Sequence, residues 1–544
     1  MRLLIPLFLC LLNTPYSTAL SAQTVDFVKA RLKEAAQKSW ELGTRSQALL
    51  ELESPSLSVF TATSIPGSPA SLGSSNKTST LVPHINAAKI ALASGQLGDI
   101  IGISTDILKS RPDGSLALMK DGSSADPASN GVAMLVANWT EAQGPDFSSA
   151  ASDQLTWLLE HVPRSDKGAI SHRNNALQLW SDFIYMVPPF LAYYGATTSN
   201  KTLITESYRQ IKLYREVLLD KSGLWQHIRQ GSFEDKGLWS TGNGWATMGM
   251  MRVAATIKAA GYEDEFKNEM KDLSDWTAGI FDAMWPLLTS DNLFYNYADN
   301  SKTFLDAASS ALMAASVYRA AALFNNTDYL AAAEKVYTTI GGPASSSPVP
   351  SSSVESSAST STSDTEAPTA TPAKRRSHSR RASHHRVPLH VLHPNSNTHH
   401  QPNLQTRAST HIDSNGWLSP VVDPHVFHKL GKESAEGQAF VIMMYAARND
   451  WLVKHRELHL NFKISGNGGG PVANVVGVGV VAGSPASVGN SGAGGLSGAV
   501  NVGGSANGTT GAESSSNGAT PVYHHGLFVG ALAGVCASLF TLLI

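Results

Sequence analysis

The stretch LQLWSDFIYMVPPFLAYY, residues 177–194, is the part of the sequence that decides the fold. Its apolar side chains recur every three or four residues, which is the spacing of one face of an α-helix. The same spacing returns at residues 245–259, 305–323, 329–340 and 434–452, with glycine and Asn-Gly punctuation between such stretches. Alternation typical of β-strands is scarce. The sequence therefore predicts an all-α body of roughly a dozen helices, arranged as helical hairpins around a common axis.

Asp182 interrupts this apolar, aromatic run, so its carboxyl group is expected to be buried. A buried carboxylate is costly unless it is paired, hydrogen-bonded or protonated. Burial also raises the pKa of a carboxyl group, which is what a proton-donating acid needs near neutral pH. The alternative is a structural aspartate satisfied by neighbouring backbone or hydroxyl groups. Both interpretations fit the local sequence.

Asp126 and the segment around Asn243 are the next polar positions in aromatic or helical surroundings. Asp126 precedes a proline and opens a helical stretch, so it is either a helix cap or a second catalytic carboxylate. Trp239 and Trp245 flank a Gly-Asn-Gly turn shortly after His227, an arrangement suited to stacking against a sugar face. A helix start with buried tryptophans is the alternative at this position.

A third polar position, Glu436 with Gln438, begins another helical stretch, where a glutamate suits the positive end of the helix dipole. Structural and binding roles both remain open there. Signatures of a serine-hydrolase elbow, a His-Glu-x-x-His zinc helix and a phosphate-binding loop do not occur in the sequence. The net charge of −2 and the pI of about 6.8 argue against a nucleic-acid partner.

The two ends of the sequence predict a secreted, membrane-tethered protein. Residues 1–22 have the charged start, apolar core and small-residue exit of a signal peptide, cleaved between Ala19 and Gln23. Residues 526–544 are apolar and follow small residues and a polar spacer, as in a glycosylphosphatidylinositol (GPI) signal. We expect the lipid at Asn517 and removal of residues 518–544, which anchors the protein in the outer membrane leaflet, at the extracellular face of the plasma membrane or in the cell wall. An ordinary C-terminal membrane helix is the alternative.

Changes in amino-acid composition divide the rest of the sequence, residues 23–517, into a folded body, an insert and a stalk. Residues 23–340 and 411–464 form the predicted helical body. Residues 341–410 are rich in Ser, Thr, Pro, His and Arg and are expected to be a disordered insert, and residues 465–517 a Gly/Ser-rich stalk. Both cysteines, Cys10 and Cys536, lie in the segments expected to be removed. Asn-x-Thr sequons predict glycosylation at Asn76, Asn138, Asn200 and Asn325.

Taken in order, four segments resemble glycoside hydrolase family 88/105, the unsaturated glucuronyl and rhamnogalacturonyl hydrolases. The match extends from about Asn130 to Trp451 with the insert excluded. Its most specific parts are Trp180 to Met186, which is similar to the family's Trp-Met-Asp-x-x-x-Met segment, and Trp239 with Gly242-Asn243-Gly244-Trp245. Supporting similarity comes from Phe304 to Ala311 and from Glu436-Gly437-Gln438-Ala439.

The resemblance implies a six-hairpin α/α barrel and an unusual reaction. The family's substrates carry a 4,5-unsaturated uronic acid left by a polysaccharide lyase, and an aspartate protonates the double bond so that water adds. By position, Asp182 takes the acid/base role and Asp126 is the second carboxylate. The substrate-binding residues would be His172, His227, Trp239, Asn243 and Trp245. The resemblance implies an oligosaccharide substrate and neither a metal nor an organic cofactor, and we expect a monomer.

One departure leaves the substrate open. The family usually reads Trp-Ala-Arg-Gly-Asn, and here Thr241 stands in the place of the arginine. An arginine offers a bidentate fork to a sugar carboxylate. A neutral sugar substrate and a non-catalytic, glycan-binding wall protein are therefore alternatives. A mannanase-type wall hydrolase on the same barrel is another, although the adjacent aspartate pair expected of it is not seen in the candidate site.

Overall fold

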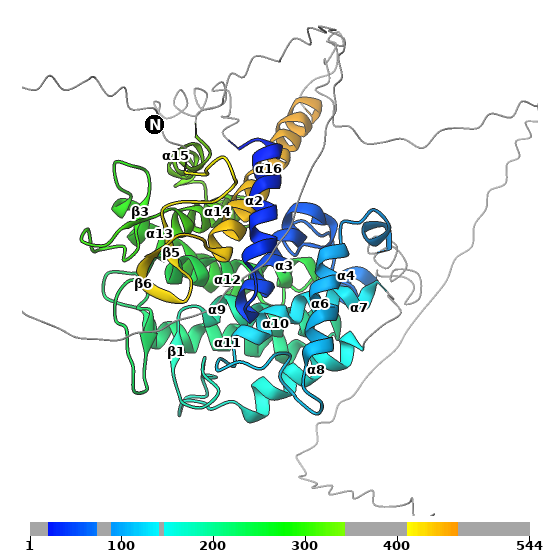
Figure 1. The fold of residues 1–544 in the computed structure, drawn as a ribbon. Helices are drawn as coiled ribbons and strands as arrows, with labels where there is room; N and C mark the ends of the chain where they lie inside the picture. Colours follow the sequence, from blue (N-terminus) through cyan, green and yellow to red (C-terminus); the bar gives the residue numbers. More distant parts are fainter. Residues whose placement is uncertain (1–19, 73–88, 141–145, 343–410, 466–544) are drawn as a thin grey trace, which may run out of the picture. The chain divides into compact units, whose positions relative to one another are not determined.

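The computed structural model describes residues 20–72, 89–140, 146–342 and 411–465, and the described chain is mostly helical (Figure 1). The predicted signal peptide up to Ala19, Asn76, the insert, the stalk and Asn517 lie outside the described residues. The longer helices are α2 (Ala22–Ala35), α3 (Ser39–Glu53), α6 (Gly98–Ser110), α7 (Gly131–Trp139), α8 (Phe147–Thr156), α10 (Pro188–Thr197), α11 (Lys201–Leu218), α12 (Ser240–Ala259), α13 (Lys267–Met284), α14 (Ala307–Phe324), α15 (Leu330–Gly341) and α16 (Ala435–Ser465).

Six of these helices in the described part of the chain form a closed inner ring. Around the ring, α3 contacts α7, α7 contacts α10, and α10 contacts α12; α12 contacts α14, α14 contacts α16, and α16 returns to α3. An outer helix packs on each: α6 on α3, α8 on α7, α11 on α10, α13 on α12, α15 on α14 and α2 on α16. The predicted six-hairpin α/α barrel is confirmed.

The two layers differ in sequence as their positions require. Nearly every residue of α12 and α14 is buried, because an inner helix has neighbours on all sides. In α11 and α13 the buried residues fall on one stripe, and the other face is polar. Helix α14 is long and apolar enough to cross a membrane, but its apolar window is 83% buried inside the protein, as in the core helix of a folded domain.

The stretch of residues 177–194 is helical only in part. Leu179–Trp180 form strand β1, which pairs antiparallel with β2 (Ile228–Arg229), and helix α9 (Phe183–Met186) begins only after the turn at Asp182. Pro188 begins α10, because a proline lacks the N–H that a continuing helix would need. The expectation of an uninterrupted helix from Leu177 is therefore wrong, since backbone pairing with β2 takes the first residues.

Two other short sheets are present in the described chain. Strands β3 (Phe294–Tyr295) and β4 (Leu305–Asp306) pair antiparallel, as do β5 (Val421–Asp423) and β6 (Val426–Gly431). These hairpins and the β1–β2 pair contribute the loops from which most of the candidate site is built.

Asp306 joins the segments on either side of the predicted insert. Its Oδ2 accepts hydrogen bonds from the backbone N–H of Ser309 (3.0 Å) and from Thr241 Oγ1 (3.3 Å). Its Oδ1 accepts from the N–H groups of Val422 (3.0 Å) and Ala308 (3.3 Å). One buried carboxyl group thus caps α14 and binds both α12 and β5.

Candidate active site

Asp182 lies in the turn between β1 and α9. It occupies the N-cap position of α9, but its side chain makes no capping bond there. The side chain is 15% exposed, and burial raises its pKa above the usual value for aspartate. The nearby His227 ring and the Ser181 hydroxyl, 3.2 Å from Oδ2, oppose this rise. Asp182 therefore retains its proton to higher pH than an ordinary aspartate.

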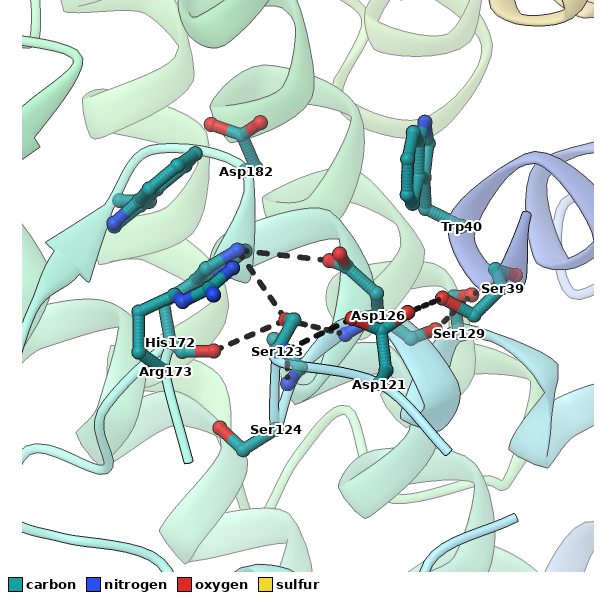
Figure 2. A network of polar contacts seen from close by, with 12 residues as sticks. Ser39, Trp40, Asp121, Ser123, Ser124, Asp126, Ser129, His172, Arg173 and Asp182 are labelled. Atoms are coloured by element: carbon teal, nitrogen blue, oxygen red, sulfur yellow. Dashed lines mark hydrogen bonds and ion pairs between the residues drawn. The ribbon is translucent and has the colours of Figure 1, made fainter. Parts of the chain in front are cut away.

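Asp126 opens the short 3₁₀ helix η2 (Asp126–Asn130), yet its side chain does not cap that helix either. Ser123 Oγ takes that place by accepting from the N–H groups of Ala125 and Asp126. The Asp126 carboxyl group is thereby free to face His172, with 3.6 Å between Oδ1 and Nε2 (Figure 2). Burial, followed by the charges of Asp121 and Asp182, raises the pKa of Asp126 well above its usual value.

His227 is held on its other side by a second carboxylate. Its Nδ1 lies 3.0 Å from Asp235 Oδ2, which also accepts a hydrogen bond from the Tyr297 hydroxyl at 2.5 Å. Hydrogen bonds from His227 and Tyr297 lower the pKa of Asp235 despite its burial, so this carboxylate is ionised at neutral pH. The Asp235 carboxylate orients the His227 ring through Nδ1, and Nε2 on the other side of the ring lies 3.6 Å from Asp182 Oδ2.

Aromatic rings frame these groups. The rings of His172 and Trp180 are stacked, with centroids 4.7 Å apart and an interplanar angle of 9°. The ring of His227 contacts Trp180 at 5.5 Å, Trp239 at 4.4 Å and Phe427 at 4.6 Å. Burial lowers the pKa of His172 well below its usual value, so this ring is neutral near neutral pH. The structure thus brings together Asp182, Asp126, His172, His227 and Trp239.

Asn243 and Trp245 do not belong to this group. The Asn243 side chain is buried and bonded to the backbone N–H and C=O of Trp225 and to the C=O of Trp239. Trp245 is 1% exposed and packs between Tyr185 and Phe440 in the core. Neither side chain can contact a bound sugar in this structure. The prediction of substrate binding by Asn243 and Trp245 is corrected: both hold α12 against its neighbours.

Two residues that were not assigned to the site from the sequence lie beside it. Glu436, at the start of α16, accepts a hydrogen bond from Trp40 Nε1 at 2.5 Å. Burial raises the pKa of Glu436 well above its usual value, and the charges of Glu41, Asp182 and Asp126 add to this rise. In Figure 2, Trp40, Asp126 and Asp182 border the same region. The position of Glu436 at a helix start was visible in the sequence, but 396 residues separate it from Trp40.

Arg173 places a positive charge near Asp126 and His172. It follows His172 directly, and its positive charge opposes the rise in the pKa of Asp126 (Figure 2). Thr241, by contrast, is buried and bonded to Asp306. Within the described residues, no group of three or more His, Cys, Asp or Glu side chains could hold a metal ion.

The described glycosylation candidates are exposed. Asn138 lies near the end of α7, Asn200 precedes α11 and Asn325 follows α14 in a left-handed conformation. Asn200 Oδ1 accepts a hydrogen bond from the N–H of Thr202 and caps α11. Exposure is what attachment of a glycan requires, and glycosylation at these three positions stays a prediction.

Part of the chain is similar to a known family of enzymes. The model of Glycosyl Hydrolase Family 88 matches residues 107–348. Residues 107–348 are therefore similar to the glycoside hydrolases of family 88. The predicted family and the prediction of a glycoside hydrolase are confirmed. The matched segment includes Asp126, Asp182, His172, His227 and Trp239, whereas Trp40 and Glu436 lie outside it.

Solved structures with similarity to this chain include three from bacteria. One, described as a possible member of GH105 family from Salmonella enterica subsp. enterica serovar Paratyphi A, is 14% identical, covers 82% of this chain and 97% of its own, and has a TM-score of 0.49. Glycosyl hydrolase family 88 from Bacteroides vulgatus is 9% identical (79% and 100% covered, TM-score 0.47). An unsaturated glucuronyl hydrolase from Bacillus sp. GL1 is 13% identical (57% and 84% covered, TM-score 0.36). No curated protein sequence matches the chain.

Proposed function

We propose that this protein is a cell-surface hydrolase that removes a 4,5-unsaturated uronic acid from the end of oligosaccharides produced by polysaccharide lyases. The observation that carries the proposal is the Asp182 carboxyl group. It is largely buried, its pKa is raised, and it lies beside His227 Nε2, which has no hydrogen-bond partner in the described part of the chain. A general acid near neutral pH needs these properties.

The proposed reaction begins with transfer of the Asp182 proton to C4 of the C4=C5 double bond. The ring oxygen stabilises the positive charge that develops at C5. A water molecule then adds to C5 and gives one proton back to Asp182, so the acid is regenerated. The product is a hemiketal at C5. The bond between C5 and the ring oxygen then breaks, which leaves a ketone at C5 and a hemiacetal at C1. The hemiacetal collapses to an aldehyde and releases the remaining oligosaccharide with a free hydroxyl group. His227 Nε2, 3.6 Å from Asp182 Oδ2, positions the carboxyl group during these steps.

Recognition of the uronate carboxylate is assigned in this proposal to Arg173 rather than to position 241. The Thr241 side chain is buried and used by Asp306, so it cannot reach a ligand. The partly exposed Arg173 places a positive charge next to the Asp126 and His172 pair. A guanidinium group binds a carboxylate with two parallel hydrogen bonds.

The test is a screen of fragments prepared with lyases from pectic, glycosaminoglycan and glucuronan polysaccharides, followed by loss of ultraviolet absorbance from the double bond. We expect turnover of at least one fragment class by the wild-type protein. Arg173→Ala is expected to raise KM for that fragment by about tenfold or more and to change kcat less. Turnover of neutral glycosides alone would replace this proposal with a neutral-sugar hydrolase, and binding without turnover would leave a glycan-binding protein.

The cell-surface part of the proposal rests on the predicted signal peptide and lipid anchor. Treatment of intact cells with phosphatidylinositol-specific phospholipase is expected to release the active protein into the medium. Protein that stays with the membrane, in cells where a known lipid-anchored protein is released, would favour the C-terminal membrane helix.

A further inference from the structure

Asn296 lies directly after strand β3, and its side-chain amide connects two of the aromatic residues around His227. Its Oδ1 accepts a hydrogen bond from Trp239 Nε1 at 2.9 Å, and its Nδ2 donates to the backbone C=O of Phe427 at 2.8 Å. An indole N–H only donates and a carbonyl only accepts, so the orientation of the amide follows from its partners. Asn296 is fully buried, and both bonds are shielded from water.

The backbone of Asn296 is fixed as well. Its N–H donates to the C=O of Phe304 at 2.8 Å, and its C=O accepts from the N–H of Ser240 at 2.9 Å. Ser240 is the first residue of α12 and directly follows Trp239. The amide is therefore held in place relative to the Trp239 ring, and it connects that ring to the segment of Phe427.

Trp239 and Phe427 both pack on the ring of His227. Their centroids lie 4.4 and 4.6 Å from the centroid of His227 and 6.2 Å from each other. Phe427 meets the His227 ring edge-on, with an interplanar angle of 86°, which is a favoured arrangement of aromatic pairs. Together with Asp235 at Nδ1, these two rings define the orientation in which His227 Nε2 lies 3.6 Å from Asp182.

Phe427 reaches the site from a distant part of the chain. It lies in β6, 131 residues after Asn296, and the predicted insert falls between them. The pairs that join β5 to β6 are Val421 with Gly431, Val422 with Leu430, and Asp423 with Val426. Phe427 belongs to none of these pairs. The hydrogen bond from Asn296 therefore fixes its backbone at a point that the hairpin ladder does not hold.

We propose that Asn296 is a positioning residue of the hydrolase, which holds Trp239 and Phe427 against His227 and thereby keeps Nε2 beside Asp182. The inference rests on the proposed function, because the orientation of His227 affects the rate only if Asp182 performs the reaction. Without the amide, the two aromatic residues lose their common partner and the His227 ring gains freedom to move. A displacement of about 1 Å in a catalytic site can cost about 100-fold in rate.

The experiment measures kcat and KM of Asn296→Ala, Phe427→Ala and the double variant on the best fragment from the screen. Each single variant is expected to lower kcat by about 10- to 100-fold and to change KM by less than about threefold. The loss in the double variant should be smaller than the product of the two single losses, because both substitutions remove the same contact with His227. Phe427→Leu keeps an apolar side chain against His227 and is expected to recover most of the activity.

Phe27→Ala is the matched control, because it removes the ring of an exposed phenylalanine on the outer helix α2. Phe427 is itself partly exposed on a hairpin, so its variants test the proposal even if Asn296→Ala does not fold. A purely structural role predicts a lower Tm with an unchanged kcat of the folded fraction, and that result would overturn the proposal. A rise in KM without a fall in kcat, or a double-variant loss equal to the product, would overturn it as well.

Failure of the proposed function gives a different result, since the wild-type protein would then turn over none of the fragments. In that case, the imidazole signals of His227 are compared by NMR in ¹⁵N-histidine-labelled proteins, with His227→Gln to assign them. Changed His227 signals in Asn296→Ala and Phe427→Ala, but not in Phe27→Ala, would support the positioning of this ring by Asn296. Signals that are the same in all of these proteins would reject it.

Discussion

Oδ2 of Asp182 lies 3.6 Å from Nε2 of His227, and this buried nitrogen has no hydrogen-bond partner among the described residues. A buried polar atom without a partner is costly in a folded protein, and such atoms collect where a ligand or a proton transfer completes the bonding. The contact links an acid that holds its proton to a base that the opposite carboxylate, Asp235, orients. It is the part of the site from which the reaction can be tested most directly.

Asp182→Asn is expected to lower kcat by about 10²–10⁴-fold, because the amide keeps the shape of the side chain and cannot supply a proton. The measurement is loss of double-bond absorbance on the best fragment from the screen, with circular dichroism to verify the fold. Asp272→Asn is a suitable control, since Asp272 bonds Tyr208 between the outer helices α11 and α13. Activity of Asp182→Asn equal to that of the control would remove Asp182 from the acid role.

Asp235→Asn is expected to reduce kcat by about 100-fold while KM changes by less than about threefold. The amide no longer holds the proton of His227 on Nδ1 with a negative charge, so Nε2 loses its fixed role beside Asp182. Tyr297→Phe removes only the second hydrogen bond to Asp235 and is expected to cost about tenfold or less. A purely structural role for Asp235 predicts instead that stability falls and that kcat of the folded fraction does not change.

Ser181→Ala is expected to move the alkaline limb of the pH–rate profile to higher pH. The Ser181 hydroxyl stabilises the ionised form of Asp182, so its removal raises the pKa of Asp182 further. Activity depends on the protonated acid and therefore falls as pH rises through this pKa. The profile of kcat/KM against pH for the two proteins gives the comparison. A limb that moves to lower pH, or does not move, would show that Asp182 does not control it.

Glu436→Gln is expected to stabilise the protein at neutral pH. The pKa of Glu436 is raised in the folded protein, so the stability that its proton provides is complete below the pKa of the unfolded chain and is lost as pH rises through the folded pKa. Glutamine does not ionise and still accepts the Trp40 hydrogen bond. We expect the Tm near neutral pH to rise by about 2–4 °C, with little difference in acid, as measured by calorimetry. The opposite order would mean that the Glu436 carboxylate is paired in the folded state.

Within the predicted cleavage range from Ala19 to Gln23, the structure favours cleavage after Ala19, so that the mature protein begins at Leu20 rather than at Gln23, as the boundary at residue 22 would have it. Ser17 and Ala19 provide the small residues that signal peptidase requires. Leu20 is 4% exposed, and Ser21 Oγ caps α2 by accepting from the N–H of Thr24 at 3.0 Å. Cleavage after Ala22 would remove that cap, at a cost of about 1 kcal/mol. N-terminal sequencing of the secreted protein decides the position, and a first residue of Gln23 would contradict the expectation.

Much of the fold and half of the site follow from local sequence. Helical periodicity predicts α14, α15 and the start of α16 to within two residues, because tertiary packing buries the faces that the pattern marks. It also predicts the end of α12, but α12 begins at Ser240, before the periodic stretch that starts at Trp245. Asp182 could be predicted because a carboxyl group in an apolar run costs free energy to bury, so its presence there needs a reason. Both the helix-cap and the catalytic interpretation of Asp126 were open, and the hydroxyl of Ser123 decides against the cap.

The errors have a common physical cause. Helix α12 is buried on all sides, so its periodicity cannot show which face of the helix lies toward the site, or whether Asn243 and Trp245 are on that face. Trp40 and Glu436 come from opposite ends of the described chain, and only closure of the ring through α3 and α16 brings them together. Contacts at such separations leave no pattern in a single sequence.

The four hydrogen bonds to Asp306 have a consequence for how this protein can be made and matured. They bind α12 and α14, which precede residue 343, to β5, which follows residue 410, through a carboxyl group that water does not reach. The ring is therefore closed by packing as well as by the covalent chain. A processing protease that cuts at Lys374-Arg375-Arg376 would convert the protein into a two-chain enzyme whose halves stay associated and whose catalytic groups keep their places.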